Sequence, residues 1–171
     1  GTLQPRKNLI RLIEAFERVK RVKRIKMDEK GKEIKLVLAG KKGWLYEEIF
    51  QKVKELELEN SVIFTGFVSE QEKITLLKNA IAFILPSLYE GFGIPVLEAM
   101  NVGCPVIVSK NSSLSEVAGK AAVYIKNPYQ IDSIQNSLLK MLELNEKERN
   151  EMVKEGYKKG KEFTWEKCSQ K

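Results

Sequence analysis

The chain has 171 residues, 43% of them hydrophobic and 31% charged, a composition typical of a folded domain rather than of a disordered or fibrous protein. Its 30 Lys and Arg residues outnumber 23 Asp and Glu, so the formal net charge is +7, and anionic partners such as nucleotides, nucleic acid or anionic lipid come into question. Histidine is absent and the two cysteines lie far apart, which removes the commonest general base and argues against a disulfide framework or a zinc site.

The first half of the chain alternates helical and strand-like patterns. Apolar residues at three- and four-residue steps indicate the first helix, for which Asn8 is the predicted N-cap. Ser69 and Glu72 have the spacing of a capping box, so another helix is expected to begin there. We expect helices over residues 8–23, 45–58 and 69–80, and strands over residues 34–40 and 61–67.

The second half continues the alternation. We expect strands over residues 81–87, 105–109 and 121–126, and helices over residues 93–103, 113–119, 131–144 and 146–163. The strands are apolar runs rather than alternating patterns, which is typical of a parallel sheet covered on both faces. The sequence therefore predicts an α/β fold, a Rossmann-like doubly wound parallel sheet with helices on both faces, in a single domain over residues 1–171.

In such sheets ligands bind at the carboxyl ends of the strands, and the segment YEGFGIP lies between a predicted strand and a predicted helix. Backbone amides near residues 92–94 would attract phosphate, and Gly91 and Gly93 would let a ligand approach the backbone. Glu98, about one turn into the helix, could accept hydrogen bonds from a ribose diol, and Glu90 could reach a second polar ring. Alternatively, Glu98 only complements the helix dipole and Glu90 is a solvated loop residue.

Two further segments are basic. Arg6 and Lys7 precede the first helix, where two cations suit a diphosphate, although they could equally be the basic start of a helix in a basic protein. The stretch RVKRVKRIK, residues 18–26, is interpreted as the solvated face of a helix or as a membrane-surface contact whose apolar side would consist of Phe16, Val19, Val22 and Ile25. No aromatic residues interleave its charges, so a nucleic acid partner is not expected.

Several motifs in order carry a family resemblance: GTLQPRKN, LVLAG, VIFTGFVS, PSLYEGFGIPVLEAM and SSLSEVAG. Together they resemble the C-terminal domain of group 1 glycosyltransferases of the GT-B type, and FTWEKC is similar to the closing helix of that domain. The E-x7-E motif of the family matches Glu90 and Glu98. One departure is Thr2, where many relatives carry Arg, so the cationic role would fall to Lys7 and Arg6.

The resemblance implies a site for a nucleotide-diphosphosugar. Glu98 would hold the ribose hydroxyls and Glu90 a hydroxyl of the transferred sugar, while Lys7, assisted by Arg6, would neutralise the diphosphate leaving group. The backbone around the site would contribute at Gly91, Phe92, Gly93 and Ile94 to the phosphates or sugar, and at Gly66, Phe67 and Val68 to the base.

The resemblance also implies an activity and a setting. The full-length protein would be a retaining hexosyltransferase that needs no metal, with a GDP- or UDP-sugar donor, and the GTL-x-PRKN variant hints at GDP-mannose. An N-terminal acceptor domain, and a first strand, would precede this chain, which alone would bind nucleotide without catalysing. The cysteine pattern makes a reducing, cytoplasmic location the expectation, with peripheral contact at the inner face of the membrane as an option. Two alternatives stay open: a glycosidase using Glu90 and Glu98 as paired carboxylates, or a basic anion- or membrane-binding module.

Overall fold

The computed structural model describes residues 2–22, 33–44, 46–110 and 113–163. The segments 23–32, 111–112 and 164–171, which include part of the basic stretch and most of the FTWEKC motif, lie outside the described residues. In chain order the elements are β1 (Thr2–Leu3), η1 (Pro5–Lys7), α1 (Leu9–Arg21), β2 (Leu36–Ala39), β3 (Lys41–Lys42), α2 (Glu47–Glu55), β4 (Val62–Gly66), α3 (Glu70–Asn79), β5 (Phe83–Leu85), α4 (Ile94–Asn101), β6 (Val106–Ser109), α5 (Leu114–Ala118), β7 (Ala122–Ile125), α6 (Ile131–Glu143) and α7 (Glu146–Glu162).

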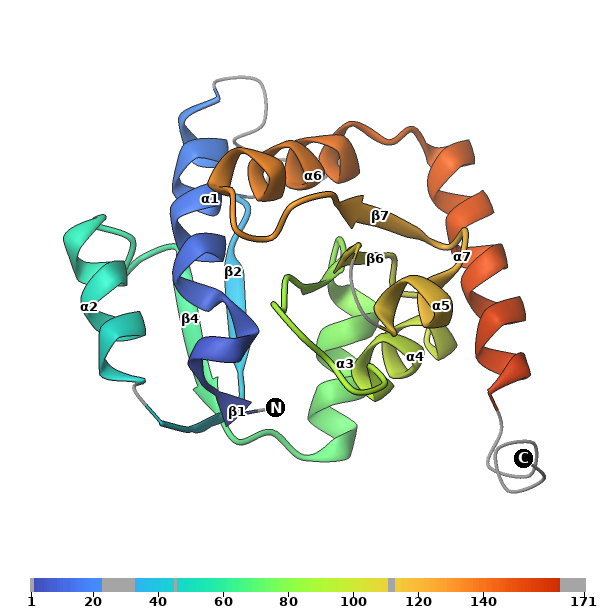
Figure 1. Cartoon of the computed structure of the whole chain (residues 1–171), viewed down its shortest axis with the longest axis horizontal. Helices are drawn as coiled ribbons and strands as arrows, with labels where there is room; N and C mark the ends of the chain where they lie inside the picture. Colours follow the sequence, from blue (N-terminus) through green and yellow to red (C-terminus); the bar gives the residue numbers. More distant parts are fainter. Residues whose placement is uncertain (1, 23–32, 45, 111–112, 164–171) are drawn as a thin grey trace.

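The strands pair in parallel throughout the described residues. Three ladders form, β1–β3, β2–β4 and β5–β6–β7, and helices alternate with the strands along the chain (Figure 1). Parallel pairing with intervening helices confirms the predicted α/β class. The division of the strands into separate ladders was not predicted, because strand patterns carry no information on which strands pair.

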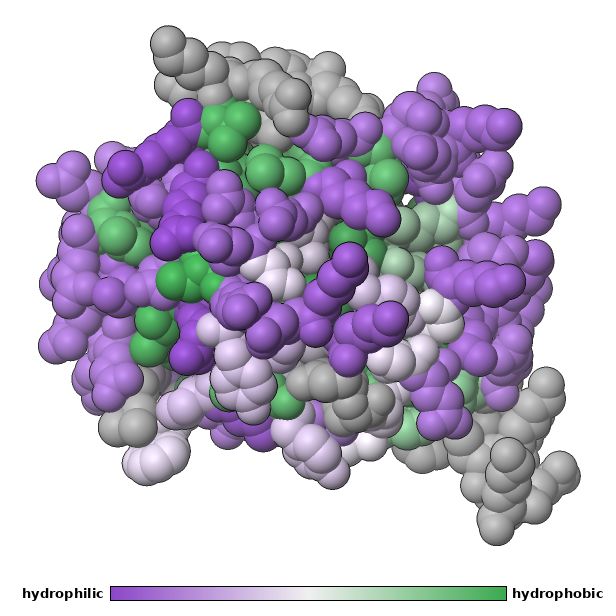
Figure 2. Space-filling model, turned by 45° about the horizontal axis from the view of Figure 1, so that its top comes forward, coloured by the Kyte–Doolittle hydropathy of each residue, from purple (hydrophilic) through white to green (hydrophobic). Residues whose placement is uncertain are grey.

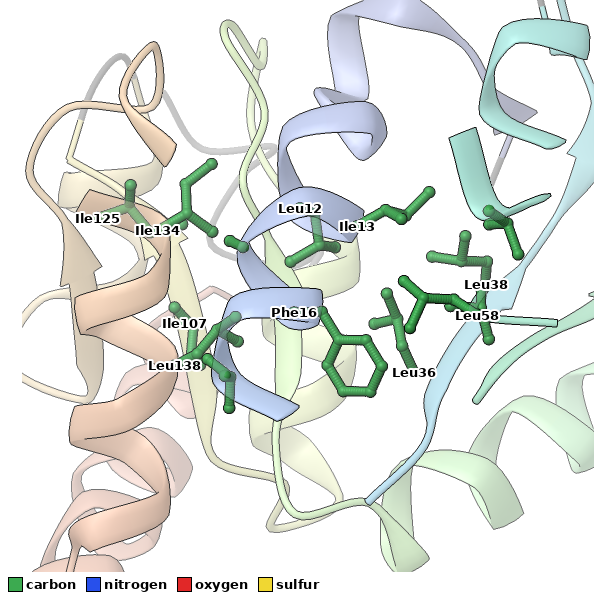
Figure 3. Close-up of a cluster of buried hydrophobic side chains, with 14 of the residues drawn as sticks. Leu12, Ile13, Phe16, Leu36, Leu38, Leu58, Ile107, Ile125, Ile134 and Leu138 are labelled. Atoms are coloured by element: carbon green, nitrogen blue, oxygen red, sulfur yellow. The ribbon is translucent and has the colours of Figure 1, made fainter. Parts of the chain in front are cut away.

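Helix α1 supplies the centre of the larger core. Its side chains Leu12, Ile13 and Phe16 are at most 4% exposed, and α1 packs against both α2 and α6. Figure 3 shows them between Leu36, Leu38 and Leu58 on one side and Ile107, Ile125, Ile134 and Leu138 on the other. The helix therefore joins the β2–β4 ladder to the β5–β6–β7 ladder through apolar contact. A second core lies beneath α4 and α5, which pack against each other, while α7 packs on α4.

Asn8 is the N-cap residue of α1, as predicted, but its side chain has another task. Asn8 precedes α1 and is 4% exposed, but its side chain makes no capping bond, and its backbone is left-handed at φ 58°. Its Nδ2 instead donates hydrogen bonds to the carbonyl oxygens of Pro86, at 3.2 Å, and Pro128, at 2.7 Å. Asn8 thus ties the start of α1 to the segments that follow β5 and β7, and so positions the residues just before it.

The predicted capping box of α3 is confirmed. The Ser69 hydroxyl accepts a hydrogen bond from the Glu72 amide at 3.3 Å, and the Glu72 carboxylate accepts one from the Ser69 amide at 2.7 Å. These reciprocal bonds satisfy amides that the first turn of a helix leaves unpaired. The helix therefore starts at a fixed point after β4.

Two of the four residues proposed as the apolar side of the basic stretch are not available to a membrane, while Val22 is half-buried and Ile25 lies outside the described residues. Phe16 and Val19 lie in the core, while Arg18 forms an ion pair with Asp132 and Lys20 with Glu33. On the face in Figure 2 hydrophilic residues predominate and the hydrophobic ones are scattered. Within the described ranges, no helix combines the length and hydrophobicity needed to cross a bilayer. The described part of the stretch is therefore a paired, solvated helix face, which is the first of its two interpretations.

Candidate functional site

The short helix η1 meets the segment between β5 and α4. The Lys7 ammonium lies 2.6 Å from Oε1 of Glu90, and Nη1 of Arg6 lies 2.8 Å from Oε2. Arg6 also donates to the Tyr89 carbonyl at 2.9 Å, and its own carbonyl accepts from the Leu88 amide at 3.0 Å. Two basic residues from one end of the chain and one acid from its middle therefore form a single cluster, with backbone bonds fixing the two segments against each other.

Glu90 is not a solvated loop residue, because it is only 8% exposed. Besides the two cations, the Ser87 hydroxyl donates to Oε1 at 2.7 Å, and the Ser113 hydroxyl donates to the Glu90 carbonyl at 3.0 Å. Burial opposes ionisation of the carboxyl, but the hydrogen bonds from Lys7, Ser87 and Arg6 outweigh it and lower the pKa of Glu90 below its usual 4.5. The carboxylate is therefore charged and fixed at neutral pH.

Helix α4 begins at Ile94, one residue after the predicted start, and Pro95 lies in its first turn. Gly93 is the N-cap residue with φ 89°, and a Cβ there would lie 2.6 Å from Cδ2 of Leu114, so the glycine is needed by the fold itself. A Cβ on Gly91 would meet no atom within 4 Å. Phe92 and Ile94 are 40% and 50% exposed. Side chains at the helix start are therefore accessible to solvent, and the N-cap residue Gly93 supplies no side-chain capping bond.

The second acid of the motif has a different partner. Glu98, on α4, accepts a hydrogen bond from the Lys73 ammonium of α3 at 2.8 Å, and its side chain is 37% exposed. Lys73 also contacts Glu70, 2.8 Å away on its own helix. Sequence analysis missed Lys73, because it lies 25 residues before Glu98 and no local pattern links two successive helices. Glu98 is thus held by a specific cation rather than only placed to complement the helix dipole.

The segment at the end of β4, residues 66–68, is exposed to solvent at Gly66 and Phe67. Gly66 has φ 70°, and a Cβ at this position would meet no atom within 4 Å. The Gly66 carbonyl accepts a hydrogen bond from the Gly40 amide at 2.8 Å. The Phe67 ring is 70% exposed, with the Lys41 ammonium 4.9 Å from its centroid, while Val68 is half-buried. Gly66, Phe67 and Val68 therefore lie at the carboxyl end of β4, directly before α3. The sequence analysis did not single out Lys41, whose ammonium lies over the Phe67 ring.

Metal-ligating side chains do not gather in the described part of the chain: no three Asp, Glu, Cys or His residues come together there.

The sequence matches the family described as glycosyl transferases group 1 over residues 1–159. The chain belongs to this family. Among curated relatives, the O-antigen chain mannosyltransferase B of Escherichia coli is 33% identical over 169 residues, a match that covers 99% of this chain and 42% of the relative. The serotype-specific mannosyltransferase WbdA of Escherichia coli is 34% identical over 143 residues, covering 82% of this chain and 16% of the relative. The chain thus spans less than half the length of these group 1 relatives.

Solved structures agree on the fold. Sucrose-phosphate synthase from Thermosynechococcus elongatus superposes with a TM-score of 0.82 at 22% identity, covering 98% of this chain and 41% of that one. Anabaena Alr3699/HepE, in complex with UDP and glucose, superposes with a TM-score of 0.78 at 22% identity, covering 95% of this chain and 42% of that one. The C-terminal domain of a glycosyl transferase group 1 family protein, LpcC from Francisella tularensis, superposes with a TM-score of 0.73 at 25% identity, covering 93% of this chain and 80% of that one. The predicted resemblance to the C-terminal domain of these enzymes is confirmed.

Proposed function

We propose that this chain is the donor-binding domain of a retaining hexosyltransferase, which binds a nucleotide-diphosphosugar for transfer to a saccharide or lipid-linked acceptor. The observation that carries the proposal is the cluster of Lys7, Arg6 and Glu90 beside the start of α4. It offers two cations and the positive end of a helix to a diphosphate, next to one fixed carboxylate for a sugar hydroxyl.

The residues have distinct chemical tasks in this proposal. Loss of a nucleoside diphosphate builds negative charge on phosphate oxygens, which Lys7, Arg6 and the amides of residues 92–94 stabilise. Glu90 accepts a hydrogen bond from the transferred sugar, and its lowered pKa keeps it an acceptor at neutral pH. The leaving phosphate can take the proton of the acceptor hydroxyl, so the reaction needs no histidine. The proposed donor contacts at Gly66, Phe67 and Val68 extend the site to the base.

The finer proposal is transfer of mannose from GDP-mannose. It is supported by the GTL-x-PRKN segment and by the names of the E. coli relatives, both of which are mannosyltransferases. Because those relatives are more than twice as long as this chain, we propose that the acceptor binds in a part of the full-length protein outside it.

A glycosidase with Glu90 as general acid is disfavoured. Such an acid needs a raised pKa so that it stays protonated near neutral pH, whereas the pKa of Glu90 is lowered by its donors. Glu90 and Glu98 also bind lysines from different elements, Lys7 and Lys73 respectively. The pair is therefore arranged as two charged acceptors rather than as an acid and a base.

Isothermal titration of the chain with GDP, UDP and ADP tests the proposal. We expect binding of at least one nucleoside diphosphate, with GDP the tightest if mannose is the sugar. A folded sample that binds none of the three contradicts the donor-site proposal, while preference for UDP contradicts only the finer one.

A further inference from the structure

The Lys73–Glu98 ion pair connects two segments that the proposed function assigns to different parts of one nucleotide. Lys73 is in the first turns of α3, which starts directly after the proposed base segment at residues 66–68. Glu98 is in α4, which starts directly after the proposed phosphate segment. The bond therefore spans the position that a ribose would occupy between base and phosphates.

Helix α3 has few other fixed points. Leu77 is the one α3 residue buried in the structure, at 9% exposure, and the capping box at Ser69 is a contact within the helix start itself. The Lys73–Glu98 bond is therefore well placed to set where the start of α3 lies relative to α4. Ion pairs as exposed as this one, at 27% and 37%, contribute little to folding stability, so we expect loss of the pair to change ligand binding more than the free energy of unfolding.

The ammonium is itself held by two carboxylates. Glu70 accepts a hydrogen bond from Lys73 at 3.0 Å, in addition to the bond that Glu98 accepts at 2.8 Å. Burial lowers the pKa of Lys73, but the hydrogen bonds to Glu70 and Glu98 outweigh this effect, so the pKa is raised and the lysine stays charged. A charged lysine uses one side of the Glu98 carboxylate and fixes its orientation, while carboxylate lone pairs remain for other donors.

We propose that Lys73 is a positioning residue for the donor site: it fixes the Glu98 carboxylate so that it accepts both hydroxyls of the ribose. This inference rests on the proposed function. It predicts that Lys73 acts on the ribose hydroxyls through Glu98 and has little effect on phosphates or base.

The test compares GDP with 2′,3′-dideoxy-GDP by isothermal titration of the parent chain, Lys73→Met and Lys78→Met. Lys78 is an exposed lysine on the same helix and serves as the matched control. We expect Lys73→Met to weaken GDP binding by about three- to tenfold, the loss typical of one hydrogen bond, and to leave dideoxy-GDP binding unchanged. Lys78→Met should change neither affinity. Lys73→Arg, which keeps the charge, should recover part of the lost GDP affinity.

A second measurement separates positioning from a direct contact. In a Glu98→Gln background, Lys73→Met should cause no further loss, because the residue it positions has already been changed. Equal losses for GDP and dideoxy-GDP, or a full additional loss in the Glu98→Gln background, would overturn the proposal. Thermal melts of each variant identify a loss caused by unfolding, and Lys73→Gln replaces Lys73→Met if the latter unfolds. If the parent binds no nucleoside diphosphate the proposed function fails, whereas parental binding with unchanged Lys73→Met affinities contradicts this inference alone.

Discussion

The Lys7 ammonium lies 2.6 Å from the Glu90 carboxylate, although 83 residues separate them in the sequence. The residue proposed for the leaving diphosphate and the residue proposed for the transferred sugar therefore bind each other in this structure. A donor arriving at this site would meet a cation already fixed in place. Such preorganisation lowers the cost of ordering flexible side chains upon binding.

Replacing Lys7 by Ala should weaken GDP binding by roughly 1–3 kcal/mol, while guanosine binding should change by much less. The reason is that the ammonium is proposed to contact the phosphates and not the nucleoside. Isothermal titration with both ligands measures the difference, with Lys78→Ala as the control. Matched losses for GDP and guanosine would exclude Lys7 from the phosphate position.

The stability of the fold should depend on the ionisation of Glu90 in acid. Its pKa is lower in the folded chain than the ordinary 4.5, so the ion pairs stabilise the fold above that value and lose their effect as the pH falls through the lowered pKa. Urea unfolding of the parent and of Glu90→Gln, at about pH 6 and about pH 3, measures this. The parent should lose more unfolding free energy between the two conditions than the variant. Parallel losses would show that Glu90 is not responsible.

Asn8 should be important for stability rather than for ligand contact. Asn8→Gly keeps the left-handed backbone but removes the bonds to Pro86 and Pro128, and should lower the free energy of unfolding by about 1–3 kcal/mol. Asn8→Ala should lose about 1 kcal/mol more, because alanine tolerates φ 58° less well. Denaturant unfolding of the parent, Asn8→Gly and Asn8→Ala measures their free energies of unfolding, which should decrease in that order. If Asn8→Ala were as stable as Asn8→Gly, the left-handed backbone at residue 8 would not contribute to the loss.

The two glycines of YEGFGIP should differ in their response to a methyl group. Gly93→Ala should destabilise the fold by roughly 2 kcal/mol or more, because of its positive φ and the clash with Leu114. Gly91→Ala should leave the melting temperature nearly unchanged, since its Cβ would enter open space. Any loss of nucleotide affinity in Gly91→Ala then reports close approach of the ligand. A stable Gly93→Ala variant would show that the fold relaxes around the methyl group.

The helices, the strands and the family could be predicted from the sequence because their signals are local. The apolar periodicity of α1, the Ser69–Glu72 capping box and Pro95 in the first turn of α4 each depend on residues within a few positions of one another. The ordered motifs around Glu90 and Glu98 likewise identified the group 1 family before any fold was known.

Only the tertiary structure decided which partners each charge has. Lys7 and Arg6 contact Glu90, and Lys73 contacts Glu98, across segments that follow strands of different ladders, while Asn8 contacts Pro86 and Pro128 far along the chain. A sequence pattern has no means to rank such distant pairings, since each one depends on the packing of α1, α3 and α4. The residue types of the proposed site could therefore be predicted from the sequence, whereas the ion pairs between them depend on the folded chain.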